Sequence, residues 1–227
     1  MEKITQLAKK YNLYIIEDAA QAVGSKYKNK MSGNLGTVGC FSLHPLKNLA
    51  GIGDGGIVTT NKKRIYNKLK LLRNHGMVDR DHQSIIGYNS RLDTINAKIL
   101  NYRINNIASV IQQRRLSAKY YIDYLKDLKE IKLPFENKYC YHTYHTFVIQ
   151  AKYRDKLQNF LLENGIETKI HYPVATIKQK PYKNMNIKLD KTLKCCDSIL
   201  SLPIGNISIQ EIEYISGKIR DFYKRLK

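Results

Sequence analysis

Four polar residues stand at or just after predicted strands within the first fifty positions. Asp18 and Gln21 follow a short apolar run, Ser42 ends a second one, and Lys47 lies in the next loop, two residues beyond Pro45. Because ligands of open parallel sheets bind at the carboxyl ends of the strands, these side chains are candidates for one site. A lysine there can form an imine with a carbonyl ligand, and a nearby carboxylate can keep a pyridinium nitrogen protonated. Lys47 and Asp18 thus predict chemistry on a carbonyl-bearing ring.

Each of these residues also has an ordinary structural interpretation. Asp18 could cap the backbone that follows its strand, and Ser42 could satisfy a strand-end N–H. Lys47 on its own is one of many lysines and could be a solvated surface residue. The Gly-Asp-Gly-Gly turn at 53–56 could suggest a nucleotide cradle, but it lacks the spacing of the Rossmann fingerprint. We interpret it as a backbone turn before a strand, and the alternatives at Asp18 and Ser42 stay open.

Alternating helices and strands are predicted to position these residues. Helical spacing of apolar residues predicts helices at 4–11 and 62–73. Short apolar runs predict buried strands at 13–16, 38–43 and 57–60. Strands that alternate with helices are typical of an α/β fold with a mostly parallel sheet. We expect such a sheet to carry the candidate site at its strand ends.

The second half of the chain indicates a smaller α/β unit. Residues 93–129 have helical spacing without Gly or Pro, which predicts one or two long helices. After Pro134 we expect two strands, a helix and a closing helix, at 143–150, 168–172, 154–164 and from Gln210. The long helical stretch is the natural boundary, so residues 1–110 and 111–227 are predicted to form two domains.

The composition indicates a globular protein. With 227 residues, 43% of them hydrophobic, the chain can bury a core. No window approaches the run of about 18 apolar residues that a membrane span needs. The opening residues also lack the apolar core of a signal peptide. These features predict a soluble, cytoplasmic protein without a membrane partner.

The cysteines and histidines form no recognisable metal-binding pattern. The four cysteines include no C-x-x-C pair, and the adjacent Cys195 and Cys196 are poorly placed to bind one tetrahedral zinc. His142, His145 and His171 have no carboxylate or cysteine partners at ligand spacing. We therefore expect reduced thiols and no metal.

The strong positive charge raises a second class of function. Lysine and arginine number 39 against 19 acidic residues, a formal net charge of +20, which is common among nucleic-acid-binding proteins. However, the basic residues are spread along the whole chain, and no nucleic-acid-binding motif is present. A lysine-rich compositional bias explains the charge better. An anionic ligand is therefore expected, and nucleic acid is kept only as an alternative partner.

Seven motifs, taken in order, resemble the DegT/DnrJ/EryC1/StrS family of sugar aminotransferases over nearly the whole chain. They are E-D-A-A-Q-A, F-S-L-H-P-L-K-N-L, G-D-G-G, L-R-N-H-G, G-Y-N-S-R-L-D, H-T-F-V-I and H-Y-P-V. The resemblance implies an aspartate-aminotransferase-like fold, fold type I of the pyridoxal-phosphate enzymes. Residues 1–110 would be the C-terminal part of the cofactor-binding large domain, and 111–227 the small domain. It also implies pyridoxal 5'-phosphate as cofactor and transfer of an amino group from an amino acid, usually glutamate, to a nucleotide-linked keto-sugar.

The resemblance also implies roles for individual residues. Lys47 would be the Schiff-base lysine and proton shuttle, with Asp18 as the partner of the pyridine nitrogen. Gln21 would contact the cofactor ring or its hydroxyl, and Ser42 would hydrogen-bond the phosphate. Asn89 would reach the phosphate of the neighbouring subunit's cofactor, which implies a homodimer.

Three further positions refine what the resemblance implies. Arg91 and His171 would lie near the interface or the substrate. A related subgroup of sugar dehydratases carries histidine where Lys47 stands, so the lysine favours transamination. Val23 replaces the usual histidine after the first motif, and F-S-L replaces the usual F-S-F. Both changes are conservative enough to leave these roles in place.

The resemblance predicts an N-terminally truncated member of the family. Family members carry a long region before the strand that ends in E-D-A-A-Q. It supplies the first strands, a helix N-terminus for the phosphate and an aromatic residue that stacks on the cofactor ring. Helix N-termini bind phosphate through their free N–H groups and the helix dipole, so without this region we expect weak cofactor binding and exposed sheet edges. The alternatives are an inactive remnant and half of a split enzyme with a complementing N-terminal chain.

Overall fold

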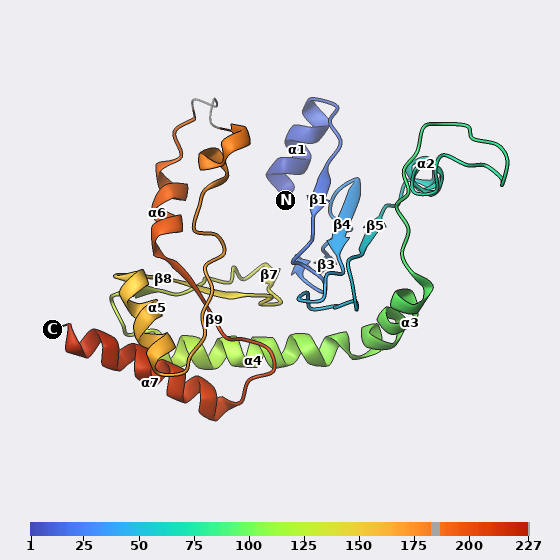
Figure 1. Ribbon diagram of the computed structural model, residues 1–227. Helices are drawn as coiled ribbons and strands as arrows, with labels where there is room; N and C mark the ends of the chain where they lie inside the picture. The colour runs from blue at the N-terminus through green and yellow to red at the C-terminus, as the bar shows by residue number, and fades with distance from the viewer. Residues whose placement is uncertain (183–186, 227) are drawn as a thin grey trace. The chain divides into compact units, whose positions relative to one another are not determined.

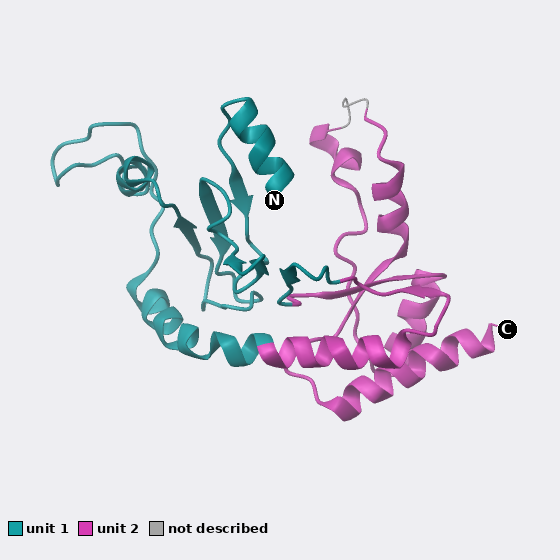
Figure 2. Ribbon diagram, turned by 180° about the vertical axis from the view of Figure 1, so that it is seen from behind, with its two compact units in different colours: residues 1–111, 136–143 teal, residues 112–135, 144–227 magenta. Residues whose placement is uncertain are grey.

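The structure, a computed structural model, describes residues 1–182 and 187–226 and separates into two compact units (Figure 1; Figure 2). Unit 1 comprises residues 1–111 and 136–143, and unit 2 comprises residues 112–135 and 144–227. The segment 136–143 thus belongs to unit 1, which a division into two continuous ranges does not anticipate. The correspondence of these units to the domains of a whole aminotransferase fold stays a prediction.

The main sheet of unit 1 has the strand order β1-β4-β5. β1 (Ile16–Asp18) runs parallel to β4 (Val38–Ser42), whereas β5 (Gly56–Thr59) runs antiparallel to β4. The prediction of a mostly parallel sheet is therefore wrong for the described part of unit 1. Residues 43–55 contain no helix, so the chain turns back beside β4 through a loop instead of crossing over. β4 and β5 match their predicted strands, and β1 lies later in the chain than the predicted 13–16.

A second, smaller sheet joins two parts of unit 1. β2 (Lys26–Tyr27), β3 (Lys30–Met31) and β7 (Cys140–Tyr141) pair antiparallel in the order β3-β2-β7. The Oγ of Ser25 and the Oγ1 of Thr143 lie 3.0 Å apart beside the β2-β7 pair. This pairing accounts for the place of the later segment in unit 1.

The helices of unit 1 confirm the predicted helical stretches. They are α1 (Glu2–Lys10), α2 (Lys63–Leu72), α3 (Thr94–Arg103) and the beginning of α4 (Ile107–Leu125). A short 3-10 turn separates α3 from α4, so the predicted helical stretch from residue 93 forms two helices in close succession. Helix α4 continues into unit 2 along the chain.

Unit 1 buries few apolar side chains. Its core cluster consists of Leu43, Leu49 and Leu100. Apolar side chains in the segment before β1 and on β1 are open to solvent instead, and Tyr14 and Ile16 are 81% and 70% exposed. Burial of a large apolar side chain stabilises a fold by about 1.5–3 kcal/mol. Further polypeptide that covered these exposed side chains would therefore stabilise unit 1.

Unit 2 is built on an antiparallel sheet with the order β6-β8-β9. The strands are β6 (Ile131–Lys132), β8 (Phe147–Ala151) and β9 (Ile199–Leu202). The helices are α5 (Arg154–Glu163), α6 (Asp190–Ser198) and α7 (Ile209–Arg225), with 3-10 turns η2 (Thr176–Lys178) and η3 (Lys180–Tyr182). The predicted helices at 154–164 and from Gln210 are confirmed. The predicted strand at 168–172 is reduced to one bridge between Lys169 and Ser201.

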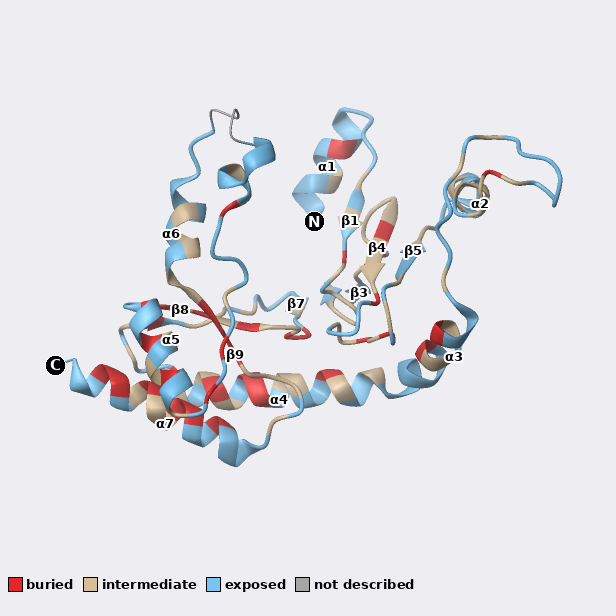
Figure 3. Ribbon diagram, in the orientation of Figure 1, coloured by how far each residue is buried: buried red, intermediate tan, exposed pale blue. Residues whose placement is uncertain are grey.

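The core of unit 2 is much larger than that of unit 1. Figure 3 shows its buried residues along β8, β9 and α7. Burial alternates along β8, as expected for a strand with one face on a core. Helix α7 begins at Ser208, whose hydroxyl accepts the Glu211 N–H at 3.2 Å while the Glu211 carboxylate accepts the Ser208 N–H at 2.8 Å. This capping box sets where the helix starts.

Tyr121, in the core of unit 2, is expected to make stability sensitive to alkaline pH. It is fully buried, and its hydroxyl has no hydrogen-bond partner within the described residues. Burial, with a smaller contribution from Glu211, raises the pKa of the Tyr121 phenol. As the pH rises, the phenol therefore loses its proton in the unfolded chain before it does so in the folded protein. The contribution of Tyr121 to the free energy of unfolding is fully present below about pH 10 and is lost above it.

The Tyr121→Phe variant tests this expectation. It should unfold in urea like the natural protein at neutral pH, because it removes an unpaired hydroxyl. Between about pH 9 and pH 11 it should lose less free energy of unfolding than the natural protein. Circular dichroism at several pH values measures the difference, and parallel losses in the two proteins would contradict the role of Tyr121.

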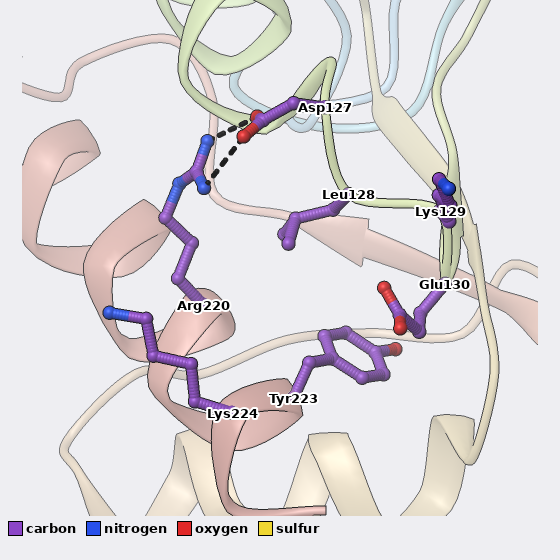
Figure 4. A pocket seen from close by; sticks show the side chains of 7 residues that line it. All are labelled: Asp127, Leu128, Lys129, Glu130, Arg220, Tyr223 and Lys224. Atoms are coloured by element: carbon purple, nitrogen blue, oxygen red, sulfur yellow. Dashed lines mark hydrogen bonds and ion pairs between the residues drawn. The ribbon is translucent and has the colours of Figure 1, made fainter. Parts of the chain in front are cut away.

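A polar pocket of about 300 Å³ lies in unit 2 beside α7 and the residues after α4 (Figure 4). Arg220 points toward Asp127 in this pocket, with its Nη1 3.1 Å from the Asp127 Oδ2. The Arg220 Nε also donates to the Tyr124 carbonyl at 2.9 Å. The hydrogen bond from Arg220 lowers the pKa of the Asp127 carboxyl. Because these charges satisfy each other, we assign the pair a structural role that ties α7 to the end of α4.

Candidate active site

The candidate residues of unit 1 lie at the carboxyl ends of β1 and β4. These strands are parallel, with Asp18 opposite Cys40. Because side chains alternate along a strand, Asp18 and Ser42 lie on the same face of the sheet. Gln21 follows in the turn just beyond β1 and is exposed. The structure therefore places Asp18, Gln21 and Ser42 at one edge, while their roles stay predictions.

Asp18 and Ser42 also make the local contacts that their structural interpretations predicted. The Asp18 Oδ1 accepts the Ala20 N–H at 3.1 Å, and the Ser42 Oγ accepts the His44 N–H at 3.3 Å. Each contact uses only part of the capacity of its group. The carboxylate keeps a second oxygen and the hydroxyl keeps its proton for a ligand. Local capping and ligand binding are thus compatible at both positions.

Lys47 lies in a closed loop between β4 and β5. The Lys47 N–H donates to the His44 carbonyl at 2.8 Å, and the Gly51 N–H closes the loop on the Leu43 carbonyl at 2.7 Å. The Lys47 residue is half-buried, and its ammonium makes no hydrogen bond or ion pair with the residues described. An amine held in this way is available to a carbonyl ligand. The glycine-rich segment that follows leads directly into β5, and its interpretation as a backbone turn stays a prediction.

Two polar residues of α3 hold the lysine loop, which comprises residues 43–52. Asn96 is 5% exposed, and its Oδ1 accepts the Ile52 N–H at 3.1 Å. The Arg103 Nη1 donates to the Ala50 carbonyl at 2.6 Å. Sequence motifs missed both residues, because they lie in another element and no local spacing links them to the loop. The only sign of this contact in the sequence is that Asn96 is a polar residue among the apolar positions of its helix.

The Asn96→Ala substitution is expected to loosen the lysine loop. It removes the hydrogen bond that the Ile52 N–H donates, and a typical intramolecular hydrogen bond contributes about 0.5–1.5 kcal/mol to stability. We expect the free energy of unfolding to fall by about that amount and peptides covering the lysine loop to exchange amide hydrogens faster. Urea unfolding and hydrogen exchange measure the two effects. Asn101→Ala, at an exposed position of the same helix, is the matched control, and an equal effect there would contradict the assignment.

The other three predicted site residues are not linked to this edge. Asn89 forms an isolated antiparallel bridge with Asn74, and both Asn89 and Arg91 are exposed. No hydrogen bond or ion pair among the described residues joins either of them to Lys47. His171 belongs to unit 2, where its Nδ1 lies 2.8 Å from the Ser201 Oγ. Their interface and substrate roles stay predictions.

Residues 1–182 and 187–226 show neither a metal site nor a membrane-spanning helix. No group of three or more His, Cys, Asp or Glu side chains in these ranges is arranged to hold a metal ion. No helix in the same ranges combines the length and the apolar character that a membrane crossing needs. The cysteines at 40, 140, 195 and 196 are free thiols.

The comparison with known proteins gives one consistent result. The family model described as the DegT/DnrJ/EryC1/StrS aminotransferase family matches residues 1–220. A pleiotropic regulatory protein from Geobacillus stearothermophilus is 36% identical over 99% of this chain and 62% of its own length. A dTDP-3-amino-3,6-dideoxy-alpha-D-galactopyranose transaminase from Aneurinibacillus thermoaerophilus is 39% identical over 95% of this chain and 60% of its own length.

Solved structures agree with the sequence relatives. A DegT/DnrJ/EryC1/StrS aminotransferase from Brucella abortus superposes with a TM-score of 0.92 at 33% identity, over 97% of this chain and 60% of that one. The similarity therefore extends across both compact units. In each of these comparisons the chain spans about three fifths of the length of the relative that it matches.

Proposed function

This chain belongs to the DegT/DnrJ/EryC1/StrS aminotransferase family, and we propose that it is the lysine-bearing part of a pyridoxal-phosphate-dependent sugar aminotransferase. The amino donor is an amino acid, glutamate in this proposal, and the acceptor is a nucleotide-linked keto-sugar. The observation that carries the proposal is the placement of Asp18 and Ser42 at the ends of two adjacent parallel strands, with Lys47 in the loop that follows Ser42. Several relatives are named as aminotransferases of nucleotide-linked sugars, which supports a nucleotide-linked keto-sugar as the acceptor.

The residues at this edge fit the cofactor in their chemistry. They offer an amine without a partner among the described residues, a carboxylate with a spare oxygen and a hydroxyl with a spare proton, which match an aldehyde, a pyridine nitrogen and a phosphate. In addition, the Oδ1 of Asn48, next to Lys47, is buried without a hydrogen-bond partner within the described residues. A polar group of this kind is one that a bound ligand can satisfy.

Each residue then has a distinct task. When bound, pyridoxal phosphate supplies an electron sink for the carbanion at the substrate α-carbon. The Lys47 Nζ would hold the cofactor and, once displaced by the amino donor, would move a proton from the substrate α-carbon to the cofactor C4′, and in the opposite direction in the reverse half-reaction. The Asp18 carboxylate keeps the pyridine nitrogen protonated. The Ser42 hydroxyl donates to the phosphate, and Gln21 orients the ring from the turn beyond β1.

A second polypeptide, either another copy of this chain or a complementing chain, is part of the proposal. Within the described residues, β5 has a neighbouring strand on one side only. An apolar groove of about 730 Å³ runs along β5 and α2, and its lining includes Val58, Leu69 and Tyr88. An unpaired strand beside an apolar groove favours the addition of another strand. The exposed Asn89 and Arg91 alternate in the chain with Tyr88, Ser90 and Leu92, which line this groove, and are proposed to face the neighbouring subunit.

Titration of pyridoxal phosphate into the purified chain tests the proposed function. We expect a saturable absorbance band from covalent attachment, and after borohydride reduction we expect the adduct on the peptide that contains Lys47. The lysine-rich composition makes mapping essential, because exposed lysines also react with aldehydes. An adduct spread over many lysines, or the absence of a saturable band, would overturn the proposal. Retention on random DNA without any response to the cofactor would favour the nucleic-acid alternative.

A further inference from the structure

We propose that Glu17 is a positioning residue that fixes the end of β1, and therefore the place of Asp18, by binding the backbone of residues 33–36. The inference rests on the proposed function in assigning Asp18 to the cofactor. Glu17 itself does not touch the ligand in this proposal. It acts through the strand that carries its neighbour.

Three backbone N–H groups converge on the Glu17 carboxylate. The Oε2 accepts the Gly33 N–H at 2.8 Å, and the Oε1 accepts the N–H groups of Leu35 and Gly36, each at 2.6 Å. Hydrogen bonds to an ionised carboxylate are shorter and stronger than those between neutral groups. This arrangement holds the Gly33–Gly36 loop, defined as residues 33–36, against β1. In the sequence, the signal for this role is a Glu that ends an apolar run and precedes a Gly-rich segment.

Glu17 and Asp18 lie on opposite faces of the sheet because they are consecutive residues of one strand. Glu17 is opposite Gly39 of β4 in the parallel register. A Cβ at Gly39 would lie 2.3 Å from the Gly33 Cα, and the Thr59 Oγ1 donates to the Gly33 carbonyl at 2.7 Å. The Gly33–Gly36 loop is therefore packed onto the face of the sheet that lies behind the proposed cofactor face.

β1 needs such support because it is short and has one neighbour. It has three residues and pairs only with β4 among the described strands. Before the strand, the Ile15 N–H donates to the Thr37 Oγ1 at 3.1 Å, and the Thr37 N–H donates to the Ile15 carbonyl at 2.8 Å. After it, the Ala19 N–H donates to the Cys40 carbonyl at 2.9 Å. Glu17 is the side chain that anchors the strand between these two contacts.

The Glu17→Gln substitution separates this role from simple folding. Glutamine keeps the shape and one acceptor oxygen, but its amide nitrogen faces N–H donors that it cannot bind. We expect amide exchange of Gly33, Leu35 and Gly36 to accelerate, and exchange of the Ala19 amide at the end of β1 to accelerate at least about tenfold with it. Glu163→Gln, the same change at an exposed position of α5, should leave all four amides unchanged.

The Ala19 amide decides the proposal without any cofactor. Faster exchange in the Gly33–Gly36 loop with an unchanged Ala19 amide would mean that Glu17 holds the loop alone, and the positioning role would be wrong. If Glu17→Gln fails to fold, Glu17→Asp, which keeps the charge on a shorter side chain, is measured in the same way.

The pH dependence of the cofactor absorbance links Glu17 to Asp18. In Asp18→Asn the ring nitrogen loses its positive charge, which otherwise repels a proton on the nitrogen that joins Lys47 to the cofactor. That nitrogen should then keep its proton to a higher pH, so the midpoint of the absorbance titration should rise. Glu17→Gln should move the midpoint in the same direction by a smaller amount. A midpoint equal to that of the natural protein would overturn the link between Glu17 and Asp18. If the natural chain shows no saturable band, the proposed function fails, whereas the Ala19 exchange still decides whether Glu17 fixes β1.

Discussion

Replacing Lys47 by alanine is expected to abolish the saturable attachment of pyridoxal phosphate to this chain. Lys47 combines a half-buried position in a closed loop with an ammonium that has no partner among the described residues. Lys47→Arg should behave like Lys47→Ala, because a guanidinium keeps the charge but is not available as a neutral amine. With a complementing polypeptide present, amine transfer should fall by about 10²–10⁴-fold, the usual contribution of a positioned proton-transfer group.

Lys30→Ala is the matched control for this prediction. Lys30 is an exposed lysine on β3 with no place in the proposed site. Absorbance titration, borohydride reduction and peptide mapping should give the natural result for this variant. A saturable band that persists in Lys47→Ala, or that disappears equally in Lys30→Ala, would show that another lysine is responsible.

The largest loss of stability is expected from Phe147→Ala in the core of unit 2. Phe147 is fully buried on β8, and its ring stacks on the Tyr121 ring at 5.0 Å between centroids. Deleting a buried phenylalanine side chain costs about 3–5 kcal/mol, since it removes apolar burial and leaves a cavity. We expect the free energy of unfolding of unit 2 to fall by that amount in urea unfolding followed by circular dichroism.

Phe135→Ala provides the comparison within the same unit. Phe135 is 86% exposed, so its removal should change the free energy of unfolding by no more than about 0.5 kcal/mol. The two variants delete the same atoms, and the difference between them measures burial alone. Similar effects of the two substitutions would mean that β8 does not pack as described.

Several elements of the fold were predictable because their signals are local. The apolar runs at β4 and β5 and the helical spacing of α2, α3, α4 and α5 depend on neighbours a few residues apart. The start of α7 follows from Ser208 and Glu211, which bond to each other across one turn. The apolar runs likewise predicted Asp18 and Ser42 at strand ends and Lys47 in the loop after Ser42.

Strand direction and pairing could not be obtained in this way. β5 runs antiparallel because the loop that carries Lys47 contains no crossover helix, a property of the path of the chain. The predicted strand at 168–172 had the right composition, but only Lys169 finds a partner on β9. Pairing depends on which backbone edges come together, and apolar patterns do not specify that.

The amino-acid sequence by itself indicated the family, through the order of its motifs, and it predicted the candidate site residues. It also predicted most helices and strands, since each of these depends on residue type or on spacing within a few turns. Only the tertiary structure decided that Glu17 binds the backbone of residues 33–36 and that Asn96 and Arg103 hold the lysine loop. These contacts join side chains to backbone groups that are distant in the chain. A backbone N–H is the same at every residue except proline, so no sequence pattern reveals which one a carboxylate or an amide will bind.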